Sequence, residues 1–186
     1  HLELARYFDF HGLFSTKTAD TVWEKGLETL AKPSHSCRGL LVQSKVRALC
    51  TTDDPTDSLE HHQAIAADPD FDVRVYPTFR PDRALWVHEA ETFNAYADRL
   101  AEVSGIDCAS LAGFQDALRS RHDFFHAIGG RLSDHGLHHL FDADCTKEQA
   151  TAIFDKVRRG QSADAAEAEA FGAYLMLYFG ELNASR

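Results

Sequence analysis

The feature that most constrains the fold is a pattern that occurs three times along the chain: a short β-favouring run, a polar cluster, and then a helix-favouring stretch. The β-favouring runs are VRALC, VRVYP and RLSDHGL. Strands that are joined through helices pair in parallel, so their carboxyl ends lie along one edge of the sheet. The sequence therefore predicts an α/β fold with three parallel strands near 46–51, 73–78 and 131–134.

The polar residues that follow these runs are expected to meet at one place, which we call the carboxyl edge. They are Thr51 to Asp54, Arg80 with Asp82, and Asp134 with His135. Open α/β sheets and (β/α)8 barrels bind their ligands at the carboxyl ends of the strands. The pattern therefore predicts a ligand site at this edge, and it does not by itself specify a reaction.

Capping residues and apolar periodicity predict the helices. Asp57 and Glu60 have the spacing of a capping box, as do Thr146 and Gln149, and Asp107 is the expected N-cap of a later helix. Apolar stripes at helical spacing are formed by Phe93, Tyr96, Leu100 and Val103, by Leu111, Phe114, Leu118, Phe125 and Ile128, and by Phe171, Tyr174, Leu175 and Tyr178.

The length of 186 residues and the hydrophobic content of 44% fit one domain with its own core. Within it, residues 1–45 are expected to be a helical elaboration, and residues 46–186 to hold the strand and helix units. Three strands cannot close a (β/α)8 barrel, which needs eight strands and about 250 residues. We therefore expect a central piece of a longer barrel enzyme.

Charge and hydropathy exclude several classes of partner. The net charge of −10 without a basic block argues against a nucleic-acid surface. No apolar run approaches the roughly 18 residues that a membrane span needs, and the start HLELARYFDF lacks the layout of a signal peptide. The four cysteines form no CxxC pair, which favours reduced thiols in a cytoplasmic protein.

The histidines do not predict a metal site. Pairs with close spacing include His61 with His62, His122 with His126, and His135 with His139. Adjacent helical positions face different directions, and Gly136 interrupts the third pair. The second pair lies near a predicted helix end, where imidazoles also interact favourably with the helix dipole. We assign no metal ligand.

Arg80 is the strongest candidate for binding an anion. It follows a β-favouring run and precedes a proline, so the guanidinium is held at the strand end, where it suits a carboxylate or a phosphate. The alternative is a salt bridge to a neighbouring aspartate. Asp134 has two similar interpretations, since it can accept hydrogen bonds from sugar hydroxyls or pair with Arg131.

Three motifs also carry a family resemblance. The segments CTTDDPTDSLEHH, YPTFRPDRAL and RLSDHGL, in this order and at these distances, resemble the uronate isomerases of the amidohydrolase superfamily. The stretches HLELARYF and TADTVWE are similar to the helical region ahead of the first motif. The resemblance covers all 186 residues, and it corresponds to roughly the middle two-fifths of the longer family sequence.

The resemblance implies a distorted (β/α)8 barrel and an aldose–ketose isomerase that acts on hexuronates, D-glucuronate to D-fructuronate and D-galacturonate to D-tagaturonate. It also implies a divalent metal, commonly zinc, held by a His-x-His pair that this sequence lacks. Arg80 and Asp134 both match family site residues. Arg80 is expected to anchor the substrate carboxylate, and Asp134 to accept a hydrogen bond from a substrate hydroxyl. Asp53, Asp54 and His135 are expected to hold Arg80 and Asp134 in place without contact to the substrate.

Two other functions stay open. The chain can be an inert packing or assembly module, or belong to a metal-dependent hydrolase of the same superfamily. Because the family's metal ligands have no counterparts here, the chain alone is expected to be inactive. A homo-oligomer of the parent enzyme is compatible with the resemblance.

Overall fold

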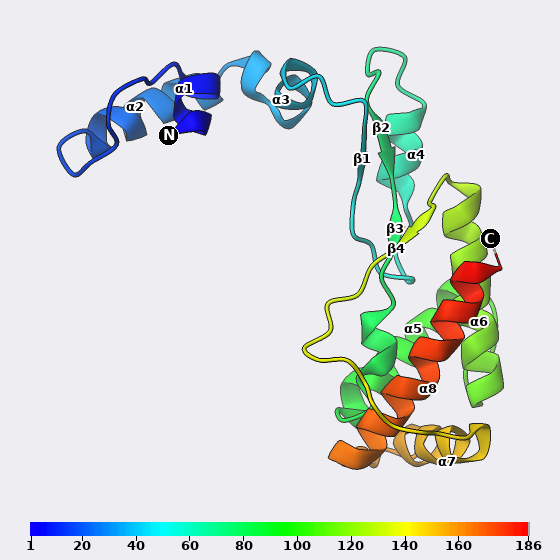
Figure 1. The fold of residues 1–186 in the computed structure, drawn as a ribbon. Helices are drawn as coiled ribbons and strands as arrows, with labels where there is room; N and C mark the ends of the chain where they lie inside the picture. The colour runs from blue at the N-terminus through cyan, green and yellow to red at the C-terminus, as the bar shows by residue number, and fades with distance from the viewer. Residues whose placement is uncertain (186) are drawn as a thin grey trace. The chain divides into compact units, whose positions relative to one another are not determined.

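The computed structural model describes residues 1–185, and the chain divides into two compact units (Figure 1). The first unit comprises residues 1–49 and 68–74, and the second comprises residues 50–67 and the chain from residue 75 onward. The second unit contains all residues of the carboxyl edge. Whether the chain behaves as the single domain expected from its length stays a prediction.

The first unit is built from short helices. They are α1 (Leu2–Phe8), α2 (Ala19–Leu30), the 3-10 helix η1 (Pro33–His35) and α3 (Cys37–Gln43). Ser36 begins α3, since its side chain accepts a hydrogen bond from the Gly39 N–H. The stretches TADTVWEKGLETLA and SCRGLLVQS contain α2 and α3, in agreement with the helical character expected of residues 1–45.

The strands are short and parallel. Strand β1 (Ala48–Cys50) pairs with β2 (Arg74–Tyr76), and β3 (Thr78–Phe79) pairs in parallel with β4 (Leu132–Ser133). A parallel bridge between Asp53 and Phe79 continues the first pairing into β3. The predicted trio of parallel strands is thus confirmed, with the middle strand divided at Pro77, which has no N–H for the ladder.

The third strand is shorter than its sequence pattern. Only Leu132 and Ser133 pair, and the chain leaves the sheet from Asp134 onward. The segment after β3 forms a second 3-10 helix, η2 (Asp82–Leu85), which turns the chain away immediately beyond the carboxyl edge. Both departures place polar residues just past the last paired residue of a strand.

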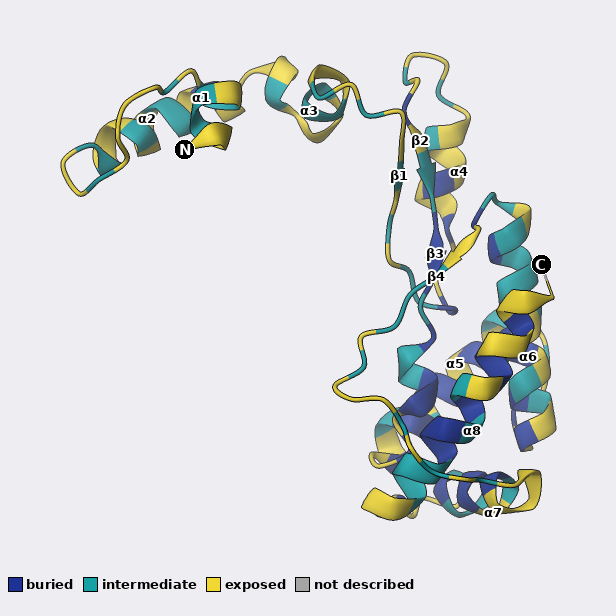
Figure 2. Ribbon diagram, viewed as in Figure 1, coloured by how far each residue is buried: buried dark blue, intermediate teal, exposed yellow. Residues whose placement is uncertain are grey.

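The core of the second unit lies among its helices, as the dark-blue positions of Figure 2 show. The helices are α4 (Glu60–Ala66), α5 (Ala90–Ser104), α6 (Leu111–Ala127), α7 (Lys147–Arg158) and α8 (Ala165–Ala184). Rings from three of them cluster: the Phe114 centroid lies 5.4 Å from those of Phe93 and Phe154. The predicted apolar stripes are confirmed, with Val103, Ile128 and Tyr174 only partly buried.

Two of the predicted helix starts are wrong. Helix α4 follows Leu59, which has a left-handed backbone at φ 56°, and no side chain caps it. Asp57 instead accepts a hydrogen bond from the Asp54 N–H within the preceding loop. Asp107 likewise accepts from the Ala109 N–H, and Ser110 caps α6. Both aspartates stabilise turns that precede the helices by a few residues.

Two capping boxes fix the last helices. The predicted pair Thr146 and Gln149 is confirmed at the start of α7. Asp164 and Glu167 form a second one at the start of α8, within an Ala- and Glu-rich stretch whose composition hides the signal. No helix within residues 1–185 is long and apolar enough to cross a membrane.

The cysteines offer a direct check of the core. All four are free thiols, and burial raises the pKa of Cys108 to about 11. At pH 8 the thiolate fraction of Cys108 is then on the order of one in a thousand, and the thiolate is the reacting form. We expect iodoacetamide to modify the exposed Cys37 and Cys50 in the native protein, and Cys108 only after unfolding.

Peptide mapping by mass spectrometry, with and without denaturant, measures this difference. Modification of native Cys108 as fast as that of Cys50 would contradict the packing at the start of α6.

Candidate functional site

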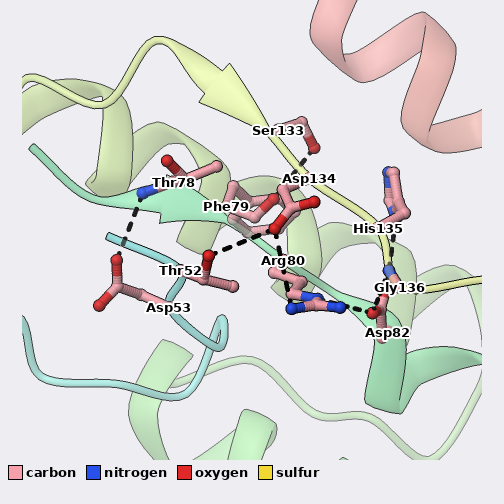
Figure 3. A network of polar contacts seen from close by, with 10 residues as sticks. All are labelled: Thr52, Asp53, Thr78, Phe79, Arg80, Asp82, Ser133, Asp134, His135 and Gly136. Atoms are coloured by element: carbon pink, nitrogen blue, oxygen red, sulfur yellow. Dashed lines mark hydrogen bonds and ion pairs between the residues drawn. The ribbon is translucent and has the colours of Figure 1, made fainter. Parts of the chain in front are cut away.

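The parallel register brings the polar residues of the carboxyl edge together. Phe79 is the partner of Ser133 in the β3–β4 pair and of Asp53 in the adjoining bridge. The next residues along β3 and β4, Arg80 and Asp134, therefore emerge side by side, as Figure 3 shows. The expectation that these segments share one edge is confirmed.

Arg80 lies between two carboxylates. Its Nε donates to Asp82 Oδ2 at 2.8 Å, and its Nη1 lies 3.8 Å from Asp134 Oδ2. The salt bridge to a neighbouring aspartate, which was the alternative role of Arg80, is therefore present. The hydrogen bond to Asp82 also raises the pKa of the guanidinium. Asp134 also accepts a hydrogen bond from Thr52 Oγ1 at 3.3 Å.

The alternative pairing of Asp134 with Arg131 is not formed. Arg131 Nη1 donates instead to the backbone carbonyls of His126 and Gly130, at the end of α6. These contacts use Arg131 to satisfy helix-end carbonyls, which have no partner within the helix. Asp134 consequently keeps Arg80 as its only cationic neighbour among the ion pairs of residues 1–185.

Asp82 connects the two sides of this network. Its Oδ2 accepts from both Arg80 Nε and the Gly136 N–H, each at 2.8 Å. Its Oδ1 lies 3.2 Å from Nδ1 of His135, whose ring stacks on Phe179 with centroids 5.8 Å apart. Asp82 therefore fixes the guanidinium of Arg80 and the loop after β4 at once. The sequence placed Asp82 on the edge and gave no sign of this role.

Gly136 is required by the close approach of Arg80. A Cβ on Gly136 would overlap Arg80 Nη2 and would lie 3.2 Å from Asp82 Oδ2. Any larger residue would force the guanidinium to move, so the glycine keeps room for it. From the sequence, Gly136 appears only as an interruption between two histidines.

Asp53 belongs to a neighbouring network at the end of β1. Its Oδ2 accepts from Thr51 Oγ1 at 2.6 Å and from the Thr78 N–H at 3.3 Å. The same hydroxyl lies 2.7 Å from Nε2 of the buried His62. A hydroxyl has one proton, so while Thr51 donates it to Asp53, His62 Nε2 must donate to Thr51. Asp53 thereby joins the end of β1 to β3.

The loop between Asp54 and Asp57 is fixed from the protein interior. Asp54 Oδ1 accepts from the Thr56 N–H and hydroxyl, while burial raises the pKa of the Asp54 carboxyl against the effect of these bonds. The buried Arg121 of α6 donates to the carbonyls of Pro55 and Asp57, both at 2.7 Å. Arg121 comes from a part of the sequence that gave no signal for the site.

A cavity of about 840 Å³ opens beside Arg80 and Asp82, a volume within the usual range for small-molecule sites. Two guanidiniums, those of Arg80 and Arg83, line it together with carboxylates. The acidic residues of the lining are Asp53, Asp54, Asp57, Asp82, Glu89 and Glu169. With so many oxygen acceptors, the cavity suits a ligand rich in hydroxyl groups.

The described residues do not fit a metal centre. Within residues 1–185, no group of three or more His, Cys, Asp or Glu side chains could hold a metal ion. His61 is 90% exposed at its side chain while His62 is buried, as expected for adjacent helical positions. His139 pairs with Glu169 through a contact of 2.7 Å between Nε2 and Oε2.

Comparison with known proteins gives one consistent result. The sequence model of a family described as glucuronate isomerase matches residues 1–186. A uronate isomerase of Solibacter usitatus is 47% identical over the whole chain, which covers 40% of that protein. A uronate isomerase of Opitutus terrae is 45% identical, again over the whole chain and 39% of that protein.

Solved structures agree. The crystal structure of a uronate isomerase from Thermotoga maritima matches all of the chain and 40% of its own, with a TM-score of 0.89 and 34% identity. A glucuronate isomerase from Caulobacter crescentus matches 97% of the chain and 37% of its own, with a TM-score of 0.86 and 27% identity.

Proposed function

Because the chain belongs to the glucuronate isomerase family, we propose that it supplies part of the substrate-binding face of a uronate isomerase. The chain spans about 40% of the length of the curated relatives it matches. The proposed reaction is the aldose–ketose interconversion of hexuronates, D-glucuronate to D-fructuronate and D-galacturonate to D-tagaturonate. The observation that carries the proposal is a cavity rich in acceptors that Arg80 lines, with Asp134 outside the lining and 3.8 Å from Nη1 of Arg80.

The proposed architecture is part of a distorted (β/α)8 barrel of the amidohydrolase superfamily. Three parallel strands that end at one edge, joined through helices, support it. In such barrels the residues that contact ligands follow the carboxyl ends of the strands. Arg80 and Asp134 are in that position.

In an aldose–ketose isomerisation, a base moves the C2 proton to C1 through an enediol while the carbonyl is polarised. The reacting carbons meet this machinery only if the far end of the open-chain sugar is held in place. We assign that holding role to this chain. Arg80 anchors the carboxylate, and Asp134 accepts a hydrogen bond from a hydroxyl of the carbon chain.

The contacts of Arg80 suit this role. Asp82 takes Nε, which fixes the plane of the guanidinium. The contact between Nη1 and Asp134 is 3.8 Å, longer than a hydrogen bond, so Nη1 keeps a proton for a ligand carboxylate. His135, Asp53 and Asp54 hold the site in place without contact to the ligand. His135 does so through Asp82, and the two aspartates do so through the segment that follows β1.

The divalent metal that the family resemblance predicts, commonly zinc, stays a prediction. Residues 1–185 offer no three-donor group for it. Carbonyl polarisation and proton transfer are therefore not assigned to side chains of this chain, whose proposed contribution is binding and orientation of the substrate.

The packing-module alternative makes an opposite prediction for the same residues. The Asp82–Arg80 bridge would then serve only to hold η2 to the loop after β4, and removal of the Arg80 charge would cost stability without an effect on a ligand. A hydrolase of the same superfamily would share the binding edge and differ in the reaction product. Product analysis separates it from an isomerase.

The whole proposal can be tested by turnover. The protein that contains this chain should convert D-glucuronate to D-fructuronate, and the 186-residue chain alone, supplied with zinc, should form no ketose. Ketose formation is followed by proton NMR at equal protein concentrations. Activity that follows the isolated chain through purification would contradict the assignment of a binding role, and absence of turnover in the protein that contains it would contradict the function.

A further inference from the structure

The two arginines of the cavity differ in how they are paired. Arg80 has Asp82 and Asp134 as partners, whereas the guanidinium of Arg83 makes no hydrogen bond and no ion pair within residues 1–185. The guanidinium forms a cation–π contact with Tyr96, in which Cζ of Arg83 lies 5.0 Å from the centroid of the ring. A partly buried cation without a carboxylate partner in a cavity is unusual, because charges in such places are normally paired.

The charges around the cavity make Arg83 important for an anionic ligand. Six carboxylates line the cavity, and a negative ligand is repelled by them at short range. The charge of Arg80 is shared between Asp82 and Asp134 and does not offset this repulsion. Among residues 1–185, Arg83 is the lining arginine that forms no ion pair and no side-chain hydrogen bond, although the charge of Asp54 acts on it from a longer distance.

We propose that Arg83 is a second carboxylate-binding residue of this cavity, which holds the acidic end of the ligand together with Arg80. The inference rests on the proposed function, because it takes the ligand to be a sugar acid. This role adds a residue of η2 to the site. The positive charge of Arg83 would offset part of the repulsion between the lining carboxylates and an anionic ligand.

The surroundings of Arg83 prepare it for this role. Tyr96 is 1% exposed and lies in the core, so its ring is a fixed support for one face of the guanidinium. The N–H groups of this guanidinium make no hydrogen bond within residues 1–185, so they can form bidentate bonds to a carboxylate. Asp54, the carboxylate whose charge acts on Arg83, already uses Oδ1 for Thr56, and burial raises the pKa of its carboxyl.

A matched pair of ligands isolates the carboxylate. L-gulonate is D-glucuronate with its aldehyde reduced, and D-glucitol differs from L-gulonate only by a hydroxymethyl group in place of the carboxylate. Neither has an aldehyde or a ketone, so neither can be isomerised. Calorimetric titration of the protein that contains this chain gives the ratio of the two affinities, which we call the anion preference.

The variants are Arg83→Gln, which removes the charge, and Arg83→Lys, which keeps it. Arg99→Gln is the control, since Arg99 is an exposed residue of α5 that pairs with Glu102 away from the cavity. A charge-assisted bond to a carboxylate corresponds to roughly a ten- to hundredfold change in affinity. We expect Arg83→Gln to reduce the anion preference by that factor, with the affinity for D-glucitol unchanged, and Arg83→Lys to retain part of it.

The outcomes separate the inference from the function on which it rests. An anion preference that survives in Arg83→Gln overturns the role of Arg83 while the uronate site at Arg80 stands. A parent protein that binds both ligands equally overturns the carboxylate contacts of both arginines. A parent protein that binds neither ligand overturns both. Melting temperatures of the variants are measured alongside, and the Arg83→Lys variant decides the question if Arg83→Gln is unfolded.

Discussion

Replacement of Arg80 by lysine in the protein that contains this chain should lower kcat/KM for D-glucuronate by about ten- to a hundredfold or more. Lysine keeps the positive charge and loses the planar fork that binds a carboxylate through two parallel bonds. It also has no counterpart of the Nε–H that Asp82 accepts at 2.8 Å. The fold should survive, because this guanidinium lies at the open edge and not in the core.

A second variant tests the same geometry without a change of charge. Gly136→Ala places a Cβ where Arg80 Nη2 now lies, so it should displace the guanidinium and reduce kcat/KM in the same direction. Kinetics and melting temperature are measured on the same preparations, with Arg99→Lys as a control outside the cavity. An unchanged kcat/KM in Arg80→Lys would show that Arg80 does not anchor the substrate carboxylate. A parallel loss of activity and melting temperature would show that the role of Arg80 is structural.

Replacement of Phe114 by alanine should lower the free energy of unfolding by about 3–5 kcal/mol. Phe114 is fully buried, and its ring contacts those of Phe93, Phe154 and Tyr96 with centroids 5.4–6.3 Å apart. Removal of the ring costs its burial and also leaves a cavity between α5, α6 and α7. The site depends on this core, because the ring of the buried Tyr96 contacts the guanidinium of Arg83.

Urea unfolding followed by circular dichroism gives the change, provided that one transition describes the data. Phe14→Ala is the matched control, because Phe14 is 52% exposed in the first unit, and its removal should change the unfolding free energy by about 0.5 kcal/mol or less. A loss below about 1 kcal/mol for Phe114→Ala would mean that the aromatic cluster between α5, α6 and α7 is not packed as described.

Local patterns were enough to predict the parallel strands and most helices. The β-favouring runs and the stripe through Phe93 and Leu100 are present in the structure. The helix that carries this stripe ends at Gly105, which is left-handed at φ 70°. Each of these signals concerns residues that are close in sequence and governed by one periodicity. The shared edge that carries Arg80 and Asp134 follows from them by the rule for parallel strands.

What the sequence did not indicate depends on contacts between distant residues. Asp82 meets Gly136 across 54 positions, and Arg121 reaches the carbonyl of Pro55 across 66. Nothing in the local composition around Gly136 shows that an arginine needs its space. The wrong N-cap at Asp57 has a local cause, because an aspartate can stabilise a turn as well as a helix start, and spacing alone does not distinguish them.

The most direct test is a crystal structure of the protein that contains this chain with bound L-gulonate, which has the carboxylate of D-glucuronate and cannot react. We expect the carboxylate oxygens to lie about 2.7–3.2 Å from guanidinium nitrogens of Arg80 and Arg83, with a ligand hydroxyl in hydrogen-bond contact with Asp134. A carboxylate bound away from Arg80, with the Asp82–Arg80–Asp134 network unchanged and no ligand beside it, would contradict the account.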